Sequence, residues 1–193
     1  NKLAATSGTI TVTERKPFAM ALNPGWNMVS IPGEPADSDI NAVISATHPA
    51  STVLTYDPSV AGGWLTAIRG DDGLFAGTLT SITAARAYWI HTTTFEAISV
   101  TIPRLASGVP TLPPTVAIAI GWNFVPVLDV SGASVATGDT GIEQTEYLAN
   151  LTISRVYSFG TVANAWTQVA TDANMTTGNG YWVYATKVGF IVP

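Results

Sequence analysis

Acidic side chains stand close together at three places in this chain of 193 residues. The pairs are Asp37 with Asp39, Asp71 with Asp72, and Glu143 with Glu146. Two carboxylates held across a cleft could cleave a glycosidic bond. Each pair, however, lies in a polar stretch that predicts a turn or the start of a helix, where acidic side chains stabilise backbone N–H groups. The pairs therefore favour a structural role over a glycosidase-like one.

The four aspartates are also the best candidates for a metal site. Their hard oxygen ligands suit calcium. The runs Asp37-Ser38-Asp39 and Asp71-Asp72-Gly73 do not match the twelve-residue EF-hand loop, so turn chemistry explains them better. We expect a protein without a cofactor, and calcium bound at these four aspartates is the alternative.

Nucleophilic catalysis has little support in the sequence. The chain holds two histidines, His48 and His91, no Gly-x-Ser-x-Gly segment and no cysteine. Neither a Ser/His/Asp arrangement nor thiol chemistry is therefore indicated. The histidines lack the spacing of zinc ligands, and no glycine-rich loop could hold a phosphate. We expect that the protein is not an enzyme.

Aromatic side chains are the remaining group that could bind a ligand. Tryptophan and tyrosine on the face of a sheet can stack against sugar rings. Trp64 and Trp166 follow turn-like residues, and we expect this pair to be exposed and able to bind a glycan. The other four tryptophans lie within alternating apolar strands, and we expect them to pack in the core: Trp26, Trp89, Trp122 and Trp182.

Two acceptor sequences for N-glycosylation occur in the second half of the chain. They are Asn150-Leu151-Thr152 and Asn174-Met175-Thr176. Asn150 and Asn174 are therefore candidate modification sites in a secreted protein.

The tryptophans reveal an internal duplication. Gly25-Trp26-Asn27-Met28-Val29 recurs as Gly121-Trp122-Asn123-Phe124-Val125. Ala87-Tyr88-Trp89-Ile90 likewise matches Gly180-Tyr181-Trp182-Val183, and Trp64 and Trp166 lie between these motifs. The second and third tryptophans are farther apart in the first copy, so we expect insertions between strands. The chain is therefore predicted to consist of two copies of one module.

Most of the sequence has the period of two that is typical of strands, in short runs bounded by Gly, Pro, Asn or Asp. The predicted fold is mainly β: two tandem antiparallel β-modules, each a small barrel or a sandwich with one short helix. In the first copy, Asp37 or Ser38 is expected to cap a helix that carries Ile40, Val43 and Ile44. In the second copy, the run from Thr140 to Glu143 matches a capping box ahead of a helix with Tyr147 and Leu148.

The domain boundaries follow from composition. Residues 17–103 and 115–193 form the two modules, and the proline-rich segment 104–114 is an extended connector. Residues 1–16 contain a lone alternating strand without a partner in its own repeat. This strand consists of Thr9, Ile10, Thr11, Val12 and Thr13.

Overall composition excludes several classes of protein. The chain has 8 Lys and Arg against 13 Asp and Glu, for a net charge of −5, which argues against nucleic-acid binding. With 47% hydrophobic residues and a mean hydropathy of +0.29, it is too apolar to be disordered. No apolar run is long enough to span a membrane. We therefore expect a folded protein without a membrane span.

The order Gly-Trp-Asn, Tyr-Asp, Gly-Trp and Ala/Gly-Tyr-Trp resembles tandem modules of large secreted and surface-anchored proteins of bacteria and archaea, which are adhesin-like or surface-layer-like. The likeness covers residues 20–193. Ala87 departs from the glycine of the pattern, and we expect this to affect turn geometry. Residues 1–14 are similar to the closing strand of a bacterial immunoglobulin-like domain. The resemblance implies an extracellular or cell-surface location and no shared catalytic residues.

We therefore expect a non-catalytic structural or adhesive module that packs with copies of itself or with neighbouring surface domains, as in a surface layer, filament or adhesin stalk. The strand from Thr9 to Thr13 could add to an exposed sheet edge of another chain. A carbohydrate-binding module that uses Trp64 and Trp166 is the alternative. An accessory domain of a secreted hydrolase is a further one.

Overall fold

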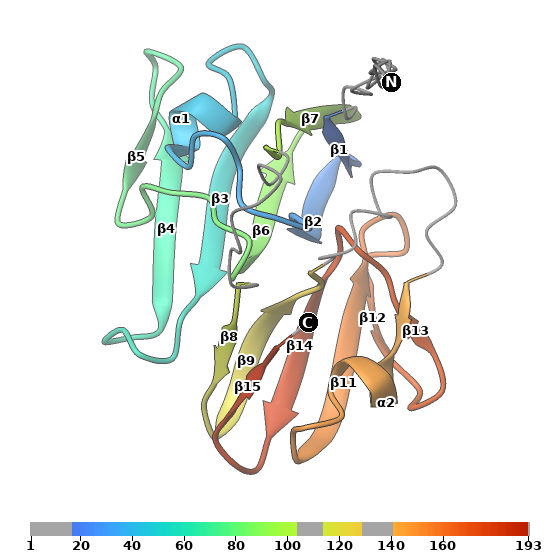
Figure 1. Ribbon diagram of the computed structural model, residues 1–193. Helices are drawn as coiled ribbons and strands as arrows, with labels where there is room; N and C mark the ends of the chain where they lie inside the picture. The colour runs from blue at the N-terminus through green and yellow to red at the C-terminus, as the bar shows by residue number, and fades with distance from the viewer. Residues whose placement is uncertain (1–16, 104–113, 129–140, 193) are drawn as a thin grey trace, which may run out of the picture.

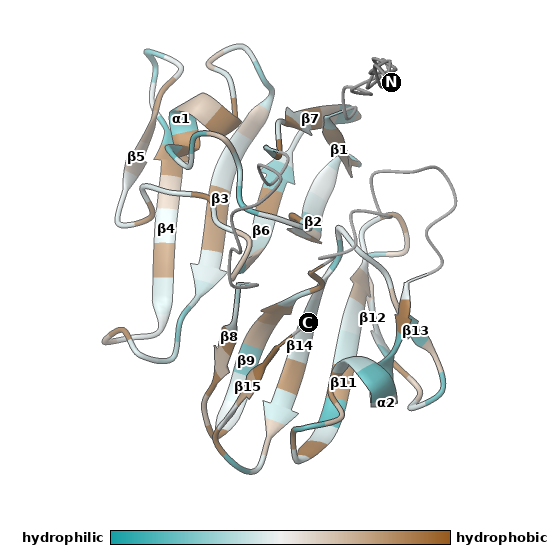
Figure 2. Cartoon of the chain, in the orientation of Figure 1, coloured by the Kyte–Doolittle hydropathy of each residue, from teal (hydrophilic) through white to brown (hydrophobic). Residues whose placement is uncertain are grey.

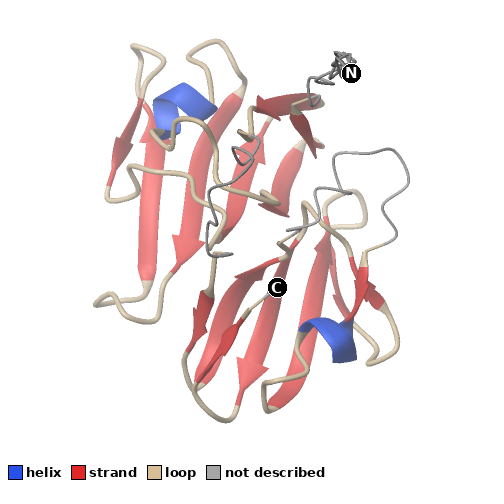
Figure 3. Cartoon of the chain, viewed as in Figure 1, coloured by secondary structure: helices blue, strands red, loops and turns tan. Residues whose placement is uncertain are grey.

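The computed structural model describes residues 17–103, 114–128 and 141–192. The predicted donor strand at Thr9–Thr13 and the connector up to residue 113 lie outside these ranges. The described chain is mainly β, with one short helix in each half (Figures 1 and 3). The predicted fold class is therefore confirmed. Within the described residues no sheet closes into a barrel, so each module is an open sandwich.

The first module contains seven strands and a helix in the order β1 (Phe18–Leu22), β2 (Gly25–Ser30), α1 (Ile40–Val43), β3 (Ala50–Tyr56), β4 (Trp64–Arg69), β5 (Phe75–Gly77), β6 (Ala87–Thr92) and β7 (Glu96–Val100). Its main sheet has the order β2-β6-β3-β4-β5, and β1 pairs with β7 in a separate ribbon. All these pairs are antiparallel.

The second module repeats this plan in the order β8 (Val116–Ile118), β9 (Gly121–Pro126), β10 (Ile142–Glu143), α2 (Gln144–Tyr147), β11 (Ile153–Gly160), β12 (Ala165–Gln168), β13 (Asn174–Met175), β14 (Gly180–Ala185) and β15 (Gly189–Ile191). Its main sheet is β12-β11-β14-β9, and β15 pairs with β8. Strand β5 has no counterpart at the equivalent edge. It lies between the second and third tryptophans, where the sequence predicted an insertion.

One face of each main sheet packs into the main hydrophobic core, which is continuous between the two modules. In the first module Val29, Val53 and Ile90 point inward and meet Leu22 and Ile98 of the ribbon. The equivalent inward residues of the second module are Val125, Val156, Val183, Ile118 and Ile191. The alternation that produces these faces is visible as bands along the strands (Figure 2).

The Gly-Trp-Asn motif closes the turn before the second strand of each module. Gly25 and Gly121 have φ of +104° and +98°, which strongly favours glycine. The asparagine two residues after this glycine is buried and binds the turn. In the first module the Asn27 amide donates to Asn23 O at 2.8 Å, and Asn27 Oδ1 accepts from Asn23 N–H at 2.8 Å. Asn123 makes the same two bonds with Ala119. The asparagine is therefore a structural residue.

The two helices occur where the sequence predicted them, but their caps differ. Asp39, not Asp37 or Ser38, is the N-cap of α1, and its carboxylate accepts from Asn41 N–H at 2.8 Å. The capping box at Thr140–Glu143 was wrong: Glu143 is itself the N-cap of α2 and makes no side-chain cap bond. The reason is that residues 142–143 first pair with β13, which delays the start of the helix.

No helix in the described ranges is both long and apolar enough to cross a membrane.

Candidate ligand-binding groove between the modules

The face of each main sheet that points away from the core carries rows of aromatic side chains. In the second module one row is Tyr157, Trp182 and Phe124, and the next is Arg155, Tyr184 and Trp122, because these residues are opposite one another on β11, β14 and β9. Strand β12 adds Trp166 opposite Phe159. The first module places the equivalent residues Trp89, Trp26 and Trp64 on its own outer face.

These two faces pack against each other in a reciprocal way. Trp182 contacts Tyr56 and Trp64 of the first module, with ring centroids 5.3 and 5.9 Å apart. Trp89 contacts the equivalent residues of the second module, Phe159 at 5.0 Å and Trp166 at 5.6 Å. The duplicated modules are therefore related by an approximate twofold axis.

Phe124 lies between the third tryptophans of the two modules. Its ring is stacked on Trp182 at 5.1 Å and on Trp89 at 6.2 Å. Together with Met28 and Ala87 it forms a small buried cluster that is separate from the main hydrophobic core. Aromatic pairs of this kind contribute on the order of 1 kcal/mol each beyond burial.

Backbone contacts add to this interface. Ser30 N–H donates to Gly178 O at 2.8 Å, and the Ser30 hydroxyl donates to Asn179 O at 2.7 Å. Thr161 Oγ1 donates to Asn27 Oδ1 at 3.2 Å, which links a loop of the second module to the turn motif of the first. The modules are thus joined by main-chain and side-chain bonds as well as by rings.

The glycine of the Gly-Tyr-Trp motif belongs to this interface. A Cβ on Gly180 would lie 2.9 Å from Ala87 Cβ and 3.2 Å from Val29 O. The expectation that Ala87 affects turn geometry is therefore wrong, because both residues lie within strands. They occupy equivalent positions that meet where the modules touch, and there is room for only one side chain.

An open groove lies over Trp182, with a volume of about 540 Å³. We call it the aromatic groove. It is lined by two side chains of the first module and four of the second: Tyr56, Trp64, Trp122, Tyr157, Trp166 and Trp182. All six combine an apolar ring with a polar N–H or O–H group, so the groove offers flat apolar faces and hydrogen-bond donors together.

The sequence predicted the exposure of two tryptophans correctly and that of two others wrongly. Trp64 and Trp166 are exposed, at 43% and 51%. Trp26 and Trp122 were expected in the core, yet they are 37% and 39% exposed. The strand period explains the error, since Asn27 points inward and its neighbour must point outward.

The tyrosine beside each third tryptophan takes the core position instead. Tyr88 is fully buried, and its hydroxyl accepts from Thr83 N–H at 2.7 Å. Tyr181 makes the equivalent bond with Thr176 N–H at 2.7 Å. Trp89 and Trp182 are therefore left on the interface face and half-buried there. The alternation of inward tyrosine and outward tryptophan could have indicated this from the sequence.

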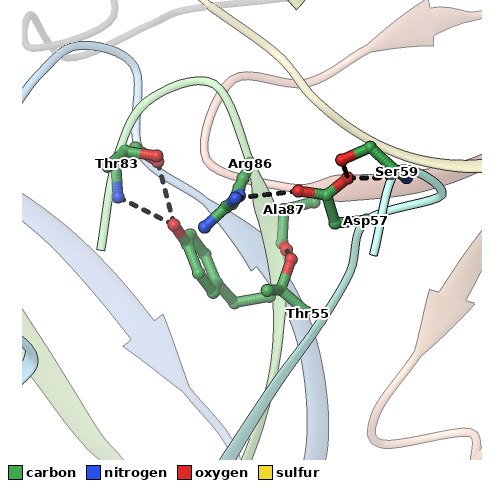
Figure 4. Close-up of polar contacts among 7 residues, drawn as sticks. Thr55, Asp57, Ser59, Thr83, Arg86 and Ala87 are labelled. Carbon is green, nitrogen blue, oxygen red and sulfur yellow. Dashed lines mark hydrogen bonds and ion pairs between the residues drawn. The ribbon is translucent and has the colours of Figure 1, made fainter. Parts of the chain in front are cut away.

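The wall of the groove is held by an ion pair. Arg86 Nη2 lies 2.9 Å from Asp57 Oδ2, and Asp57 Oδ1 accepts from both the Ser59 hydroxyl and the Ser59 N–H (Figure 4). Burial raises the pKa of Asp57, but the bonds from Ser59 and the charge of Arg86 outweigh it and lower the pKa. Asp57 follows Tyr56 directly, so this network holds the chain that presents Tyr56.

The proposed calcium aspartates take part in local turns. Asp37 Oδ1 accepts from Asp39 N–H at 3.0 Å, Asp39 caps α1, and Asp72 Oδ1 accepts from Leu74 N–H at 3.0 Å. Asp71 is exposed beside Asp72. Among the described residues no three metal-ligating side chains cluster. Calcium binding stays a prediction.

The remaining candidates lie away from the groove. His91 Nδ1 is 3.0 Å from the Ser51 hydroxyl, and the His91 ring packs on Trp26 at 5.1 Å. His48 is buried in the loop before β3. Asn150 and Asn174, the glycosylation candidates, are both exposed.

Comparison with family models, with curated proteins and with solved structures finds no match to this chain. The resemblance to tandem surface-protein modules therefore remains a hypothesis, and the proposed function rests on the geometry of the groove.

Proposed function

We propose that this chain is a non-catalytic carbohydrate-binding unit of an extracellular or cell-surface protein, and that it binds glycans in the aromatic groove. One observation carries the proposal: side chains from both modules converge on a single groove of about 540 Å³, within the range of about 300–1,000 Å³ typical of ligand sites. Trp64, Trp122 and Trp166 in this groove remain exposed, although exposing their apolar rings to water is unfavourable.

Sugar rings fit this surface for a physical reason. The C–H groups on one face of a pyranose carry a small positive charge and are attracted by the negative face of an aromatic ring. Sugar hydroxyls can pair with the phenol and indole groups at the ends of the same side chains. Among the described residues no charged side chain lines the groove, so a small anion would find no counter-charge within it.

A glycan array followed by titration calorimetry tests the proposal. Trp122→Ala is the most informative variant, because its ring contacts are all within the second module: Tyr157, Trp182 and Tyr184. We expect it to weaken binding by about tenfold or more, if a sugar gains as much as the roughly 1–3 kcal/mol of a nucleobase stacked on one aromatic ring. Trp64→Ala and Trp166→Ala should weaken binding as well.

Phe95→Ala is the matched control. Phe95 is 69% exposed and does not line the groove, so its loss removes an exposed aromatic ring elsewhere. We expect unchanged glycan binding. Thermal unfolding of every variant shows whether it is folded. Binding that survives in folded Trp122→Ala, or an array without any binding, contradicts the proposal.

A structural role in an assembly of surface domains is the second candidate. Phe95 and Val188 are matched positions, just before the last strand of each module, and both are more than 60% exposed. Strand β12 is also exposed along its whole length and lies at a sheet edge, where another strand can add. These features favour contact with copies of this chain or with neighbouring domains.

Light scattering and negative-stain microscopy over a concentration series test this second role. If the strand at Thr9–Thr13 is donated to a neighbour, a chain that begins at Pro17 should lose ordered sheets or filaments that the full chain forms. A full chain that stays monomeric at all concentrations, or equal assembly by both chains, argues against strand donation.

A further inference from the structure

We infer that the glycan bound by this chain is acidic, and that Arg155 binds its carboxylate at the outer end of the aromatic groove. This inference rests on the proposed function. It concerns a second cavity of about 380 Å³ next to the groove, lined by Trp122, Ser154, Arg155 and Tyr184. Trp122 lines both cavities, so the two are adjacent.

Arg155 is positioned by its strand. It lies opposite Tyr184 on β14, and Tyr184 lies opposite Trp122 on β9. Cross-strand neighbours share a face, and adjacent strands are about 4.8 Å apart, which places Arg155 and Trp122 roughly 10 Å apart at their Cα atoms. A sugar stacked on Trp122 therefore has the guanidinium within reach of its substituents.

A bulge in β11 adds a second polar group. The register with β14 shifts between Ile153 and Arg155, so Ser154 is the extra residue and both Ser154 and Arg155 line the cavity. Bulges often redirect side chains next to binding sites. The Ser154 and Tyr184 hydroxyls stand beside the guanidinium as additional donors.

The Arg155 side chain does not stabilise the fold through a polar contact in the described part of the chain. It is exposed, and no hydrogen bond or ion pair joins its guanidinium to another described residue. The other arginines in these ranges are engaged: Arg86 pairs with Asp57, and Arg69 donates to backbone carbonyls including Ala50 O at 2.6 Å. A guanidinium left free beside an aromatic groove is available to a ligand.

The duplicated module provides a comparison. At the place equivalent to Arg155 and Tyr184, the first module has Thr52 and His91, and the Ser51 hydroxyl binds His91 Nδ1 at 3.0 Å. The polar groups there satisfy each other. Only the second module has a cation at this position. Its guanidinium group is planar and can donate two parallel hydrogen bonds to a carboxylate.

The test uses glycans in matched pairs of an acid and its uncharged methyl ester. Suitable probes are 3′-sialyllactose with its methyl ester, which differ in one charge, and tetragalacturonic acid with its fully esterified form, which differ in four. For pairs that bind, we expect the acid to bind roughly tenfold more tightly than its uncharged counterpart at low salt, as bonds to a charged group predict. High salt should reduce this ratio.

Arg155→Gln should bring the ratio close to one without weakening the uncharged glycan. Lys187→Gln removes the same charge from an exposed residue that lines neither cavity, and it should keep the ratio. Equal binding of acid and ester, or a ratio that survives in Arg155→Gln, overturns the inference and leaves the groove proposal intact. An array in which no glycan binds overturns both.

Discussion

His48 is a buried titratable side chain with an unmet hydrogen bond. It is 6% exposed, its Nδ1 accepts from Ala50 N–H at 3.1 Å, and its Nε2 has no partner among the described residues. Burial lowers its pKa below 6.5; Glu96 raises it and Arg69 lowers it further, and the net direction is downward. The folded protein therefore holds this ring neutral at pH values where the unfolded chain already binds a proton.

The sign of the pH dependence follows from that difference. Above about pH 6.5 both states have a neutral His48 and its contribution is constant. As the pH falls below 6.5, the unfolded state gains a proton that the folded state resists, so the free energy of unfolding should decrease. Urea unfolding at pH 5.0 to 8.0 measures this decrease.

His48→Gln should flatten the decrease between pH 6.5 and 5.0, because glutamine does not titrate. His91→Gln, which removes the other histidine, is the control and should keep it. Asp57 also has a lowered pKa, but its stabilisation is lost only at more acidic pH, outside this window. An equal slope in wild type and in His48→Gln would show that His48 is not the source.

At the level of elements, turn residues and apolar spacing predicted where strands and helices occur, whereas capping motifs did not predict where the helices begin. The turn at Gly25 and the apolar spacing of Ile40 and Val43 were sufficient to place a strand and a helix. The start of α2 could not be read locally, since it depends on the pairing of β10 with β13, which are about thirty residues apart. Long-range pairing therefore decided the boundary that a capping motif failed to predict.

The groove shows the same limit more strongly. The sequence singled out Trp64 and Trp166 because each follows a turn-like residue. It could not show that Tyr56 and Trp182, from different modules, would line one groove with them, because this requires the packing of one module on the other. Duplication predicted two similar units, whereas the site arises between them.

At the scale of the whole molecule, the approximate twofold axis brings one pair of equivalent residues so close together that only one of them can carry a side chain. Ala87 and Gly180 are equivalent in the repeat and face each other across the interface. Gly180→Ala would bring two Cβ atoms to 2.9 Å, closer than real Cβ contacts allow. We expect the free energy of unfolding to fall by about 1–3 kcal/mol, the usual cost of overpacking.

Exchanging the two residues tests the geometry directly. The double variant A87G/G180A removes the Ala87 methyl that the new one meets, so it should recover part of the stability lost in Gly180→Ala. Recovery should be incomplete, because the new Cβ would still lie 3.0 Å from Phe124 Cε2 and 3.2 Å from Val29 O. A double-mutant cycle by urea unfolding measures this coupling.

Ala87→Gly alone completes the cycle and should cost about 1 kcal/mol, since it removes one buried methyl and places a glycine in a strand. Glycan affinity measured on the same variants links the interface to the site: Tyr56 and Trp64 reach the groove only while the modules stay in contact, so Gly180→Ala should weaken binding and the exchange should restore part of it. Strictly additive effects of the two substitutions on stability would mean that Ala87 and Gly180 do not meet, and that the modules pack differently in solution.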